Sequence, residues 1–172
     1  MMKEIKKQIQ KAIKDNNKIG FGRGVYELSD QIVAKPFSSK WRALHEYEIG
    51  MFAYNNGIQV PRMHQLIRPD RWLKRLNSDY HLKEWYVVMQ KIEGATIREL
   101  TNEFEAQEAR RQLNQEIDRL LDLRIYPYDS LFSNNSLFNR KENRLYLLDF
   151  CEWKRIPECE SFDRNVNLCH KS

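Results

Sequence analysis

Two hydrophobic periodicities alternate along this chain, and their order constrains the fold most strongly. Short strand-like runs with apolar residues at 25, 26 and 28 and at 32–34 flank the turn at residues 29–30, which predicts a hairpin. Residues 102–123 instead place their apolar side chains on one helical face, and a helix from residue 38 or 39 to about 54 is expected. Further strands are predicted at 85–89, 136–138 and 145–148. Because strands and helices occupy separate stretches, the predicted fold class is α+β.

Length and composition further limit the classes of protein to which the chain can belong. The 172 residues suit one compact domain or two small lobes, and a 41% apolar content excludes intrinsic disorder despite 31% charged residues. The chain contains no apolar run of the roughly 18 residues that a membrane span requires. The 3 cysteines all follow position 150 and give no disulfide framework, so we expect a reducing, cytoplasmic location. A net charge of +5 permits a nucleic-acid or membrane partner without requiring one.

The N-terminal residues 3–14 predict an amphipathic helix rich in lysine. Its apolar stripe consists of Ile5, Ile9, Ala12 and Ile13. We expect this stripe to pack on its own domain; a membrane-surface or partner-binding helix is the alternative.

A glycine-rich turn and a strand lysine come early in the chain. Gly20, Gly22 and Gly24 are closely spaced before a strand, so their backbone amides can approach a polyphosphate, although an ordinary hairpin turn has the same pattern. Lys35 lies among apolar residues of the next strand, which makes it either an edge residue or a paired inward cation.

Carboxylates that can pair with such a cation occur in two separate parts of the sequence. Glu46 and Glu48 lie on the helix that follows, and at least one of them is expected to face solvent. Later, Asp129 precedes Asn134 and Asn135, and Asp149 ends an apolar strand. A carboxylate at the mouth of a buried strand needs a partner, and a metal ion is a natural one.

Together these motifs resemble the protein-kinase-like superfamily, which includes small-molecule kinases of the aminoglycoside phosphotransferase type. The matching segments, in order, are IGFGRGVYEL, IVAKPF, WYVVMQKIEGATIREL, YPYDSLFSNN and LLDFCEW. The resemblance implies a bilobal fold with a small antiparallel-sheet N-lobe over residues 18–93 and a minimal C-lobe over 94–172, preceded by the helix within 1–17. It also implies transfer of the γ-phosphoryl group of ATP to a protein Ser/Thr or small-molecule hydroxyl.

The resemblance assigns expected roles to individual residues. The three glycines would cover the ATP phosphates, Lys35 would hold the α and β phosphates, and Glu46 or Glu48 would pair with Lys35, with Glu46 slightly favoured. Met89 would be the gatekeeper, and Gln90 through Ile92 would face the adenine. Asp129 would be the catalytic base, while Asp149 and Asn134, or Asn135, would hold Mg²⁺.

Some positions depart from the family pattern. Pro127-Tyr128 replaces the usual residues before the catalytic aspartate, and Cys151 replaces the glycine after Asp149-Phe150. Few residues follow Phe150, so we expect a protein partner or a second copy of the chain to complete the C-lobe. A pseudokinase that binds nucleotide or a protein without catalysis is therefore the alternative function.

Two minor alternatives remain open. A nucleic-acid-binding module would use the basic cluster of Arg68, Arg71, Trp72, Lys74 and Arg75, which we more readily interpret as a solvated loop. A zinc site would use Cys151, Cys159, Cys169 and His170. Because their spacing lacks the close pairs typical of zinc ligands, we favour the interpretation that the cysteines are buried or free thiols without a metal.

Overall fold

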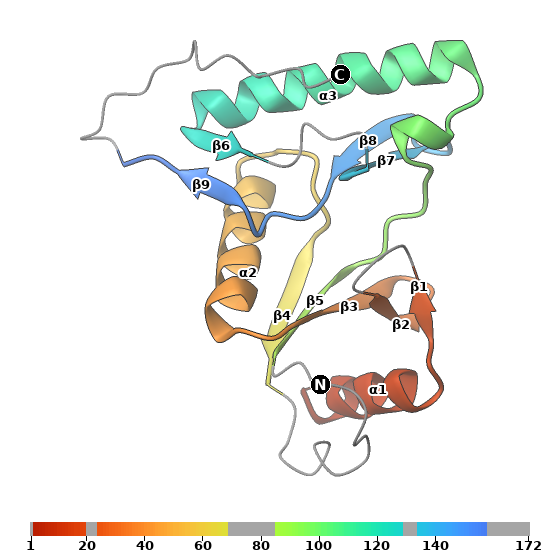
Figure 1. Cartoon of the computed structure of the whole chain (residues 1–172), viewed down its shortest axis with the longest axis vertical. Helices are drawn as coiled ribbons and strands as arrows, with labels where there is room; N and C mark the ends of the chain where they lie inside the picture. Colours follow the sequence, from red (N-terminus) through yellow and green to blue (C-terminus); the bar gives the residue numbers. More distant parts are fainter. Residues whose placement is uncertain (1, 20–23, 69–84, 129–133, 158–172) are drawn as a thin grey trace.

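The structure is a computed structural model that describes residues 2–19, 24–68, 85–128 and 134–157. Its helical elements are α1 (Met2–Lys14), α2 (Lys40–Asn55), the short 3-10 helix η2 (Ile97–Glu99) and α3 (Glu103–Asp122). Its strands are β1 (Lys18–Ile19), β2 (Val25–Ser29), β3 (Ile32–Phe37), β4 (Met63–Ile67), β5 (Trp85–Gln90), β6 (Ile125–Pro127), β7 (Ser136–Asn139), β8 (Arg144–Leu147) and β9 (Trp153–Arg155). Figure 1 shows α1 and the larger sheet at one end, α3 with the smaller sheets at the other, and α2 between them.

The larger sheet has the order β1-β2-β3-β5-β4, and each pair of neighbours is antiparallel. Alternate residues of a strand face opposite sides of the sheet, so Val33 and Phe37 belong to one core cluster and Ala34 to another. Lys35 shares the face of Val33 and Phe37. This face lies toward α2, whose Ala43 and Ile49 belong to the same cluster as Val33 and Phe37.

Helix α1 covers the opposite face of the sheet. Its Ile9 is buried together with Ala34, Ile67, Tyr86 and Val88, and Ile5 and Ile13 pack against the same cluster. The apolar stripe therefore packs on its own domain, as the periodicity predicts. The same burial leaves that stripe covered by the sheet, which argues against its use for a membrane or a partner.

Contacts of Gly94 and Ala95 join the end of the sheet to β7. Ala95 forms an isolated bridge with Phe138 of β7, and the backbone amide of each donates to the carbonyl of the other. A Cβ on Gly94 would lie 2.7 Å from the carbonyl oxygen of Phe138, so only glycine permits this approach. The small sheet β7–β8 is thereby fixed close to the end of β5.

The α+β class is confirmed, and the strongly periodic elements lie near their predicted bounds. Helix α2 begins after Ser39, which has an extended N-cap conformation but makes no side-chain cap hydrogen bond. Strands β6 and β9 pair with each other and were not predicted from the sequence. In the described part of the chain, every helix is too short or too polar to cross a lipid bilayer. The predicted division into residues 1–17, 18–93 and 94–172 stays a prediction.

Candidate functional site

Lys35 places its ammonium between two carboxylates that come from distant parts of the chain. Its Nζ donates to Oε1 of Glu46 at 2.6 Å and to Oδ1 of Asp149 at 2.8 Å. The lysine lies in the middle of β3, opposite Val87 of β5, and its side chain is 21% exposed. Lys35 is therefore an inward-facing cation paired with carboxylates, and not an exposed residue at the edge of the sheet.

Glu46 makes this pair because of its position around α2. The buried residues of the helix are Ala43, Glu46, Ile49, Gly50 and Ala53, which form one face. Glu48 lies two residues further along, on another side, and it is exposed to solvent. The structure brings Glu46 to Lys35, with 1% of the Glu46 side chain exposed, and leaves Glu48 outside the cluster.

Asp149 reaches the cluster from the turn that follows β8. It has a φ of +61°, in the left-handed region that aspartate tolerates better than most residues. Its neighbour Phe150 is buried, whereas the Asp149 side chain is 44% exposed. The carboxylate therefore touches Lys35 on one side and remains open to solvent on another, which suits a group that meets a ligand.

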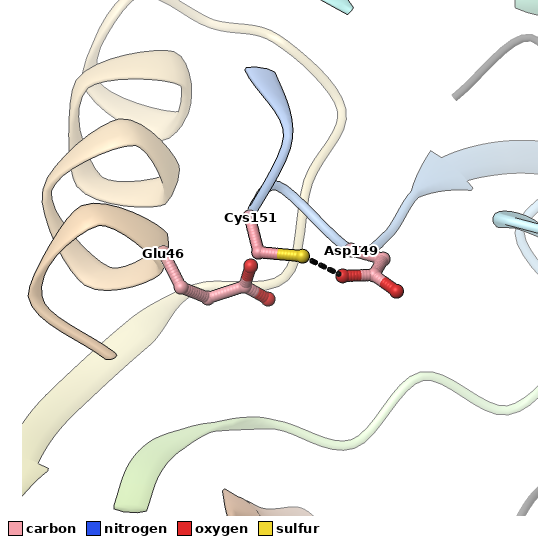
Figure 2. Close-up of side chains that lie close together, drawn as sticks. All are labelled: Glu46, Asp149 and Cys151. Atoms are coloured by element: carbon pink, nitrogen blue, oxygen red, sulfur yellow. Dashed lines mark hydrogen bonds between the residues drawn. The ribbon is translucent and has the colours of Figure 1, made fainter. Parts of the chain in front are cut away.

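Cys151 adds a thiol to this arrangement. Figure 2 shows its side chain close to Glu46 and Asp149, and the thiol Sγ donates to Oδ1 of Asp149 at 3.1 Å. One potential ligand atom from each of these three residues lies within 4.8 Å of the others. Burial, the hydrogen bond to Asp149 and the negative charge of that carboxylate raise the pKa of Cys151 to about 12. The thiol is accordingly protonated at neutral pH.

The charges of the cluster determine its protonation state. Burial by itself lowers the pKa of Lys35, but the carboxylates of Glu46 and Asp149 outweigh that effect and raise the pKa overall. Burial raises the pKa of Glu46, against the opposing influence of the Lys35 ammonium. Lys35 is thus a firmly held cation that can present positive charge to an anion in the same space.

The predicted metal ligands lie at the open end of the β7–β8 hairpin. Ser136 pairs with Leu147, and the amide of Leu148 donates to the carbonyl of Asn135 at 2.8 Å, which continues the antiparallel ladder by one step. The positive φ of Asp149 then ends the extended strand. Asn134 is exposed and Asn135 is half-buried, and both precede β7 at the end of the hairpin where Asp149 follows β8.

The predicted nucleotide-covering and hinge residues are partly described. Gly24 has a φ of +65°, which favours glycine, while Gly20 and Gly22 lie outside the described residues. Met89 is buried opposite Val33, and the Gln90 amide donates to the Arg62 carbonyl at 2.9 Å. Ile92 follows, half-buried, just after β5.

Asp129, Arg71, Trp72, Lys74, Arg75, Cys159, Cys169 and His170 also lie outside the described residues. From the basic cluster, Arg68 is described: it is exposed, and its guanidinium lies 5.7 Å from the ring centroid of Trp85. Next to Asp129, the half-exposed ring of Tyr128 packs edge-on against Tyr126.

Sequence reasoning missed two contacts beside this site. Arg42 Nη2 lies 2.6 Å from Glu152 Oε1, and His45 Nε2 lies 2.7 Å from the carbonyl oxygen of Trp153. Both join α2 to the turn that carries Asp149. No local pattern pairs residues so distant in the chain, although the position of Arg42 one turn before Glu46 is a signal that they share a helix face.

A strand lysine paired with a helix glutamate, and an aspartate at the end of a hairpin, place this architecture in the class of protein-kinase-like folds. Comparison with solved structures supports that class: the chain resembles the kinase PK-1 of Cydia pomonella granulovirus, with 16% identity and a TM-score of 0.54. The match covers 91% of this chain and 60% of the granulovirus chain, and at this identity it establishes the fold alone. No protein-family model and no curated protein matches the sequence.

Proposed function

We propose that this protein is an ATP-dependent phosphotransferase of the protein-kinase-like type, which transfers the γ-phosphoryl group to a hydroxyl of a protein or small molecule. The observation that carries the proposal is the Lys35 ammonium, held between Glu46 and Asp149 on a kinase-like fold. Isolated ion pairs are common in proteins. This one joins β3, α2 and the turn after β8, and it has an anion partly open to solvent.

The proposed chemistry is mainly electrostatic. Phosphoryl transfer spreads negative charge over the transferred group, so a fixed cation and correct alignment supply most of the rate enhancement. Lys35 would bind the α and β phosphates, Glu46 would keep its ammonium in place, and Gly20, Gly22 and Gly24 would cover the phosphates. Asp129 would orient the acceptor hydroxyl and accept its proton.

The residues present fit a magnesium ion. Mg²⁺ prefers oxygen ligands and binds proteins through one or two carboxylates together with substrate phosphates. Asp149 offers a half-exposed carboxylate, and Asn134 and Asn135, which precede β7 at the same end of the hairpin, would offer amide oxygens. Bound there, the ion would neutralise charge on the β and γ phosphates. The Cys151 thiol is a poor ligand for so hard a cation.

The adenine would bind beside the end of β5. Because the Gln90 and Lys91 amides donate to Arg62 and Gln31 within the sheet, we assign the adenine contacts to the carbonyl of Gln90 and the backbone of Ile92. Met89 would limit the depth of the pocket from its buried position.

A nucleotide-binding protein without catalysis is the second candidate. The observation that favours it is the Oδ1 atom of Asp149, which accepts hydrogen bonds from both Lys35 and Cys151. An oxygen engaged twice is a weaker metal ligand than a free one. In this alternative, Lys35 binds the phosphates and the protein acts through a partner.

The acceptor site would be completed by a protein partner or a second copy of the chain. Trp41 is 80% exposed and Phe104 is 79% exposed, and large exposed rings of this kind are frequent at protein interfaces. We propose a cytoplasmic location, because the cysteines give no disulfide framework in the sequence, which fits a reducing compartment.

Calorimetric titration and thermal unfolding with ATP, with and without Mg²⁺, test the proposal. Free ATP at a hundredfold excess over its Kd should stabilise the wild type by about 2.7 kcal/mol. Lys35→Met should lose this stabilisation, whereas the control Lys141→Met, at an exposed lysine paired with Glu93, should keep it. The Asp149→Asn and Asp129→Ala variants should still bind ATP but should show no phosphoryl transfer. ATP binding without any turnover by the wild type would favour the second candidate, and absence of ATP binding would contradict both.

A further inference from the structure

The two carboxylates on Lys35 come from different segments, and something must hold those segments together. Glu46 belongs to α2, and Asp149 belongs to the turn between β8 and β9 (Figure 2). Both reach the same ammonium nitrogen, at 2.6 and 2.8 Å. A small rotation of α2 about its axis would move Glu46 away and leave Asp149 in place.

Four residues beside the cluster connect these segments directly, and we call them the α2 anchor: Arg42, His45, Glu152 and Trp153. Arg42 Nη2 donates to Glu152 Oε1 at 2.6 Å. His45 Nε2 lies 2.7 Å from the carbonyl oxygen of Trp153. A carbonyl oxygen only accepts hydrogen bonds, so this nitrogen carries the proton and donates it.

On the turn side the α2 anchor is rigid. The amide of Trp153 donates to the carbonyl of Phe150 at 3.0 Å and closes the turn that begins after Asp149. The Phe150 and Trp153 rings are both buried and pack edge-on, with centroids 4.7 Å apart. Trp153 also pairs with Pro127 of β6, the strand that precedes Asp129. The Trp153 carbonyl that receives His45 is thus fixed relative to Asp149, and the half-exposed Glu152 side chain that receives Arg42 extends from the same turn.

On the helix side, the buried face of α2 carries one large apolar residue, Ile49. Its inner face carries small residues at Ala43, Gly50 and Ala53. A Cβ on Gly50 would lie 2.7 Å from Met63 Cε and 3.0 Å from Phe150 Cε2, so the helix backbone packs closely there without a side chain. The small residues permit close approach, and Ile49 is the large apolar side chain that this face buries in the core. Arg42 and His45 supply the directional contacts on the same part of the helix.

We propose that Arg42 and His45 are positioning residues, which hold α2 against the turn after Asp149 so that Glu46 and Asp149 engage Lys35 together before any nucleotide binds. This inference rests on the proposed function for its catalytic consequence, but the position of α2 does not depend on nucleotide. The α2 anchor then keeps the phosphate-binding lysine oriented through contacts internal to the chain, without a modification or an effector.

Kinetics of variants test the catalytic consequence. Arg42→Gln and His45→Leu each remove one contact and should lower kcat about tenfold, because misplacing a catalytic group by a fraction of an ångström costs rate. The KM for ATP should change less than about twofold, since the variants keep Lys35 and its ion pair with Asp149. Arg111→Gln on α3, which removes the similarly short ion pair with Glu108, is the matched control and should leave kcat unchanged.

Rescue distinguishes positioning from general stability. His45→Gln keeps a side-chain N–H for the Trp153 carbonyl and should restore kcat relative to His45→Leu. Exchanging the charges in Arg42→Glu with Glu152→Arg should recover activity that either single change loses. If Arg42→Gln and His45→Leu keep wild-type kcat, or if the rescuing variants are as slow as the disruptive ones, the positioning role is wrong.

Hydrogen exchange tests the same inference in the protein without nucleotide. In the Arg42→Gln, His45→Leu double variant, amides of residues 43–49 should exchange about tenfold faster, while those of α3 keep their wild-type protection. Unchanged exchange in α2 would overturn the proposal. A wild type that binds no ATP would refute the proposed function and leave this measurement fully informative, so the two failures are distinguishable.

Discussion

At the scale of single residues, Lys35 balances two carboxylates of which one has almost no contact with water. Glu46 is 1% exposed, and its Oε2 is among the buried side-chain oxygens without a hydrogen-bond partner in the described part of the chain. An anion in such a place depends on the adjacent ammonium, because burying an unpaired charge is far more costly than burying a pair. Lys35 therefore has a structural role as well as its proposed role in phosphate binding.

Replacing this lysine should destabilise the protein measurably. Lys35→Met leaves Glu46 buried without its cation, and we expect the free energy of unfolding at pH 7 to fall by about 3 kcal/mol. Lys141→Met, which removes an exposed ammonium, should stay within about 0.5 kcal/mol of the wild type. Urea unfolding measures both, and equal values for the two variants would contradict the dependence of Glu46 on Lys35.

The loss of unfolding free energy in Lys35→Met should also depend on pH, and the raised pKa of Glu46 determines the direction of that dependence. Burial raises the pKa of Glu46 above its ordinary value of 4.5, so the folded protein binds that proton more tightly than the unfolded chain. The stability linked to protonation of Glu46 is fully present below pH 4.5 and is lost as the pH rises through the pKa of Glu46 in the folded protein. Without the opposing ammonium, the difference from the wild type should be large at pH 7 and shrink toward pH 4.5. A difference that is constant over this range would refute the explanation.

Cys151 should react slowly with alkylating agents because its thiol is difficult to ionise. A pKa of about 12 in place of 9.0 lowers the thiolate fraction at pH 8 by about 10³, and the greater nucleophilicity of a more basic thiolate recovers about 20-fold of this loss. Peptide-resolved alkylation with iodoacetamide should therefore be about 50-fold slower at Cys151 than at a free cysteine. Asp149→Asn removes the adjacent negative charge and should accelerate it; no acceleration would show that burial alone protects the thiol.

At the scale of elements, the accuracy of sequence-based prediction follows the length of the periodic pattern. Helix α3 repeats its apolar residues over several turns and was predicted within a residue or so, whereas β6 and β9 have three residues each and pair across a long stretch of chain. Three residues cannot display a period. The choice between Glu46 and Glu48 likewise needed the rotation of α2, which the small residues Ala43, Gly50 and Ala53 would have indicated as the inward face.

The N-terminal helix gives a direct test of element packing. Ile9 is 1% exposed beneath the sheet, so Ile9→Ala should lower the free energy of unfolding by about 3 kcal/mol through lost apolar burial and the cavity left behind. Lys7→Ala, on the exposed side of the same helix, should change it by less than about 0.5 kcal/mol. Equal, small effects in urea unfolding would mean that α1 is detached from the sheet in solution.

At the scale of the whole molecule, the loop between α2 and β4 connects the large sheet to the helical end of the protein. Its Gln59 amide donates to Glu116 of α3 at 3.1 Å, and its Gln59 carbonyl accepts from the amide of Leu147 in β8 at 2.9 Å. Arg119 donates to the Gly57 carbonyl at 2.7 Å and to Glu116 at 2.8 Å. One buried carboxylate thus organises the contact between α3, this loop and, through the loop, the hairpin that ends at Asp149.

Removing that carboxylate should loosen the two ends of the molecule relative to each other. Glu116→Ala leaves the Gln59 amide without its acceptor and removes the ion pair with Arg119, which should cost about 2 kcal/mol of unfolding free energy. Glu116→Gln keeps an oxygen for the amide and should cost about half as much, while Asp118→Asn, at an exposed position of the same helix, should change the free energy by less than about 0.5 kcal/mol. Hydrogen exchange should show faster exchange of the Gln59 and Leu147 amides in Glu116→Ala. If those amides stay as protected as in the wild type, Glu116 does not hold the two ends of the molecule together, and apolar packing does so instead.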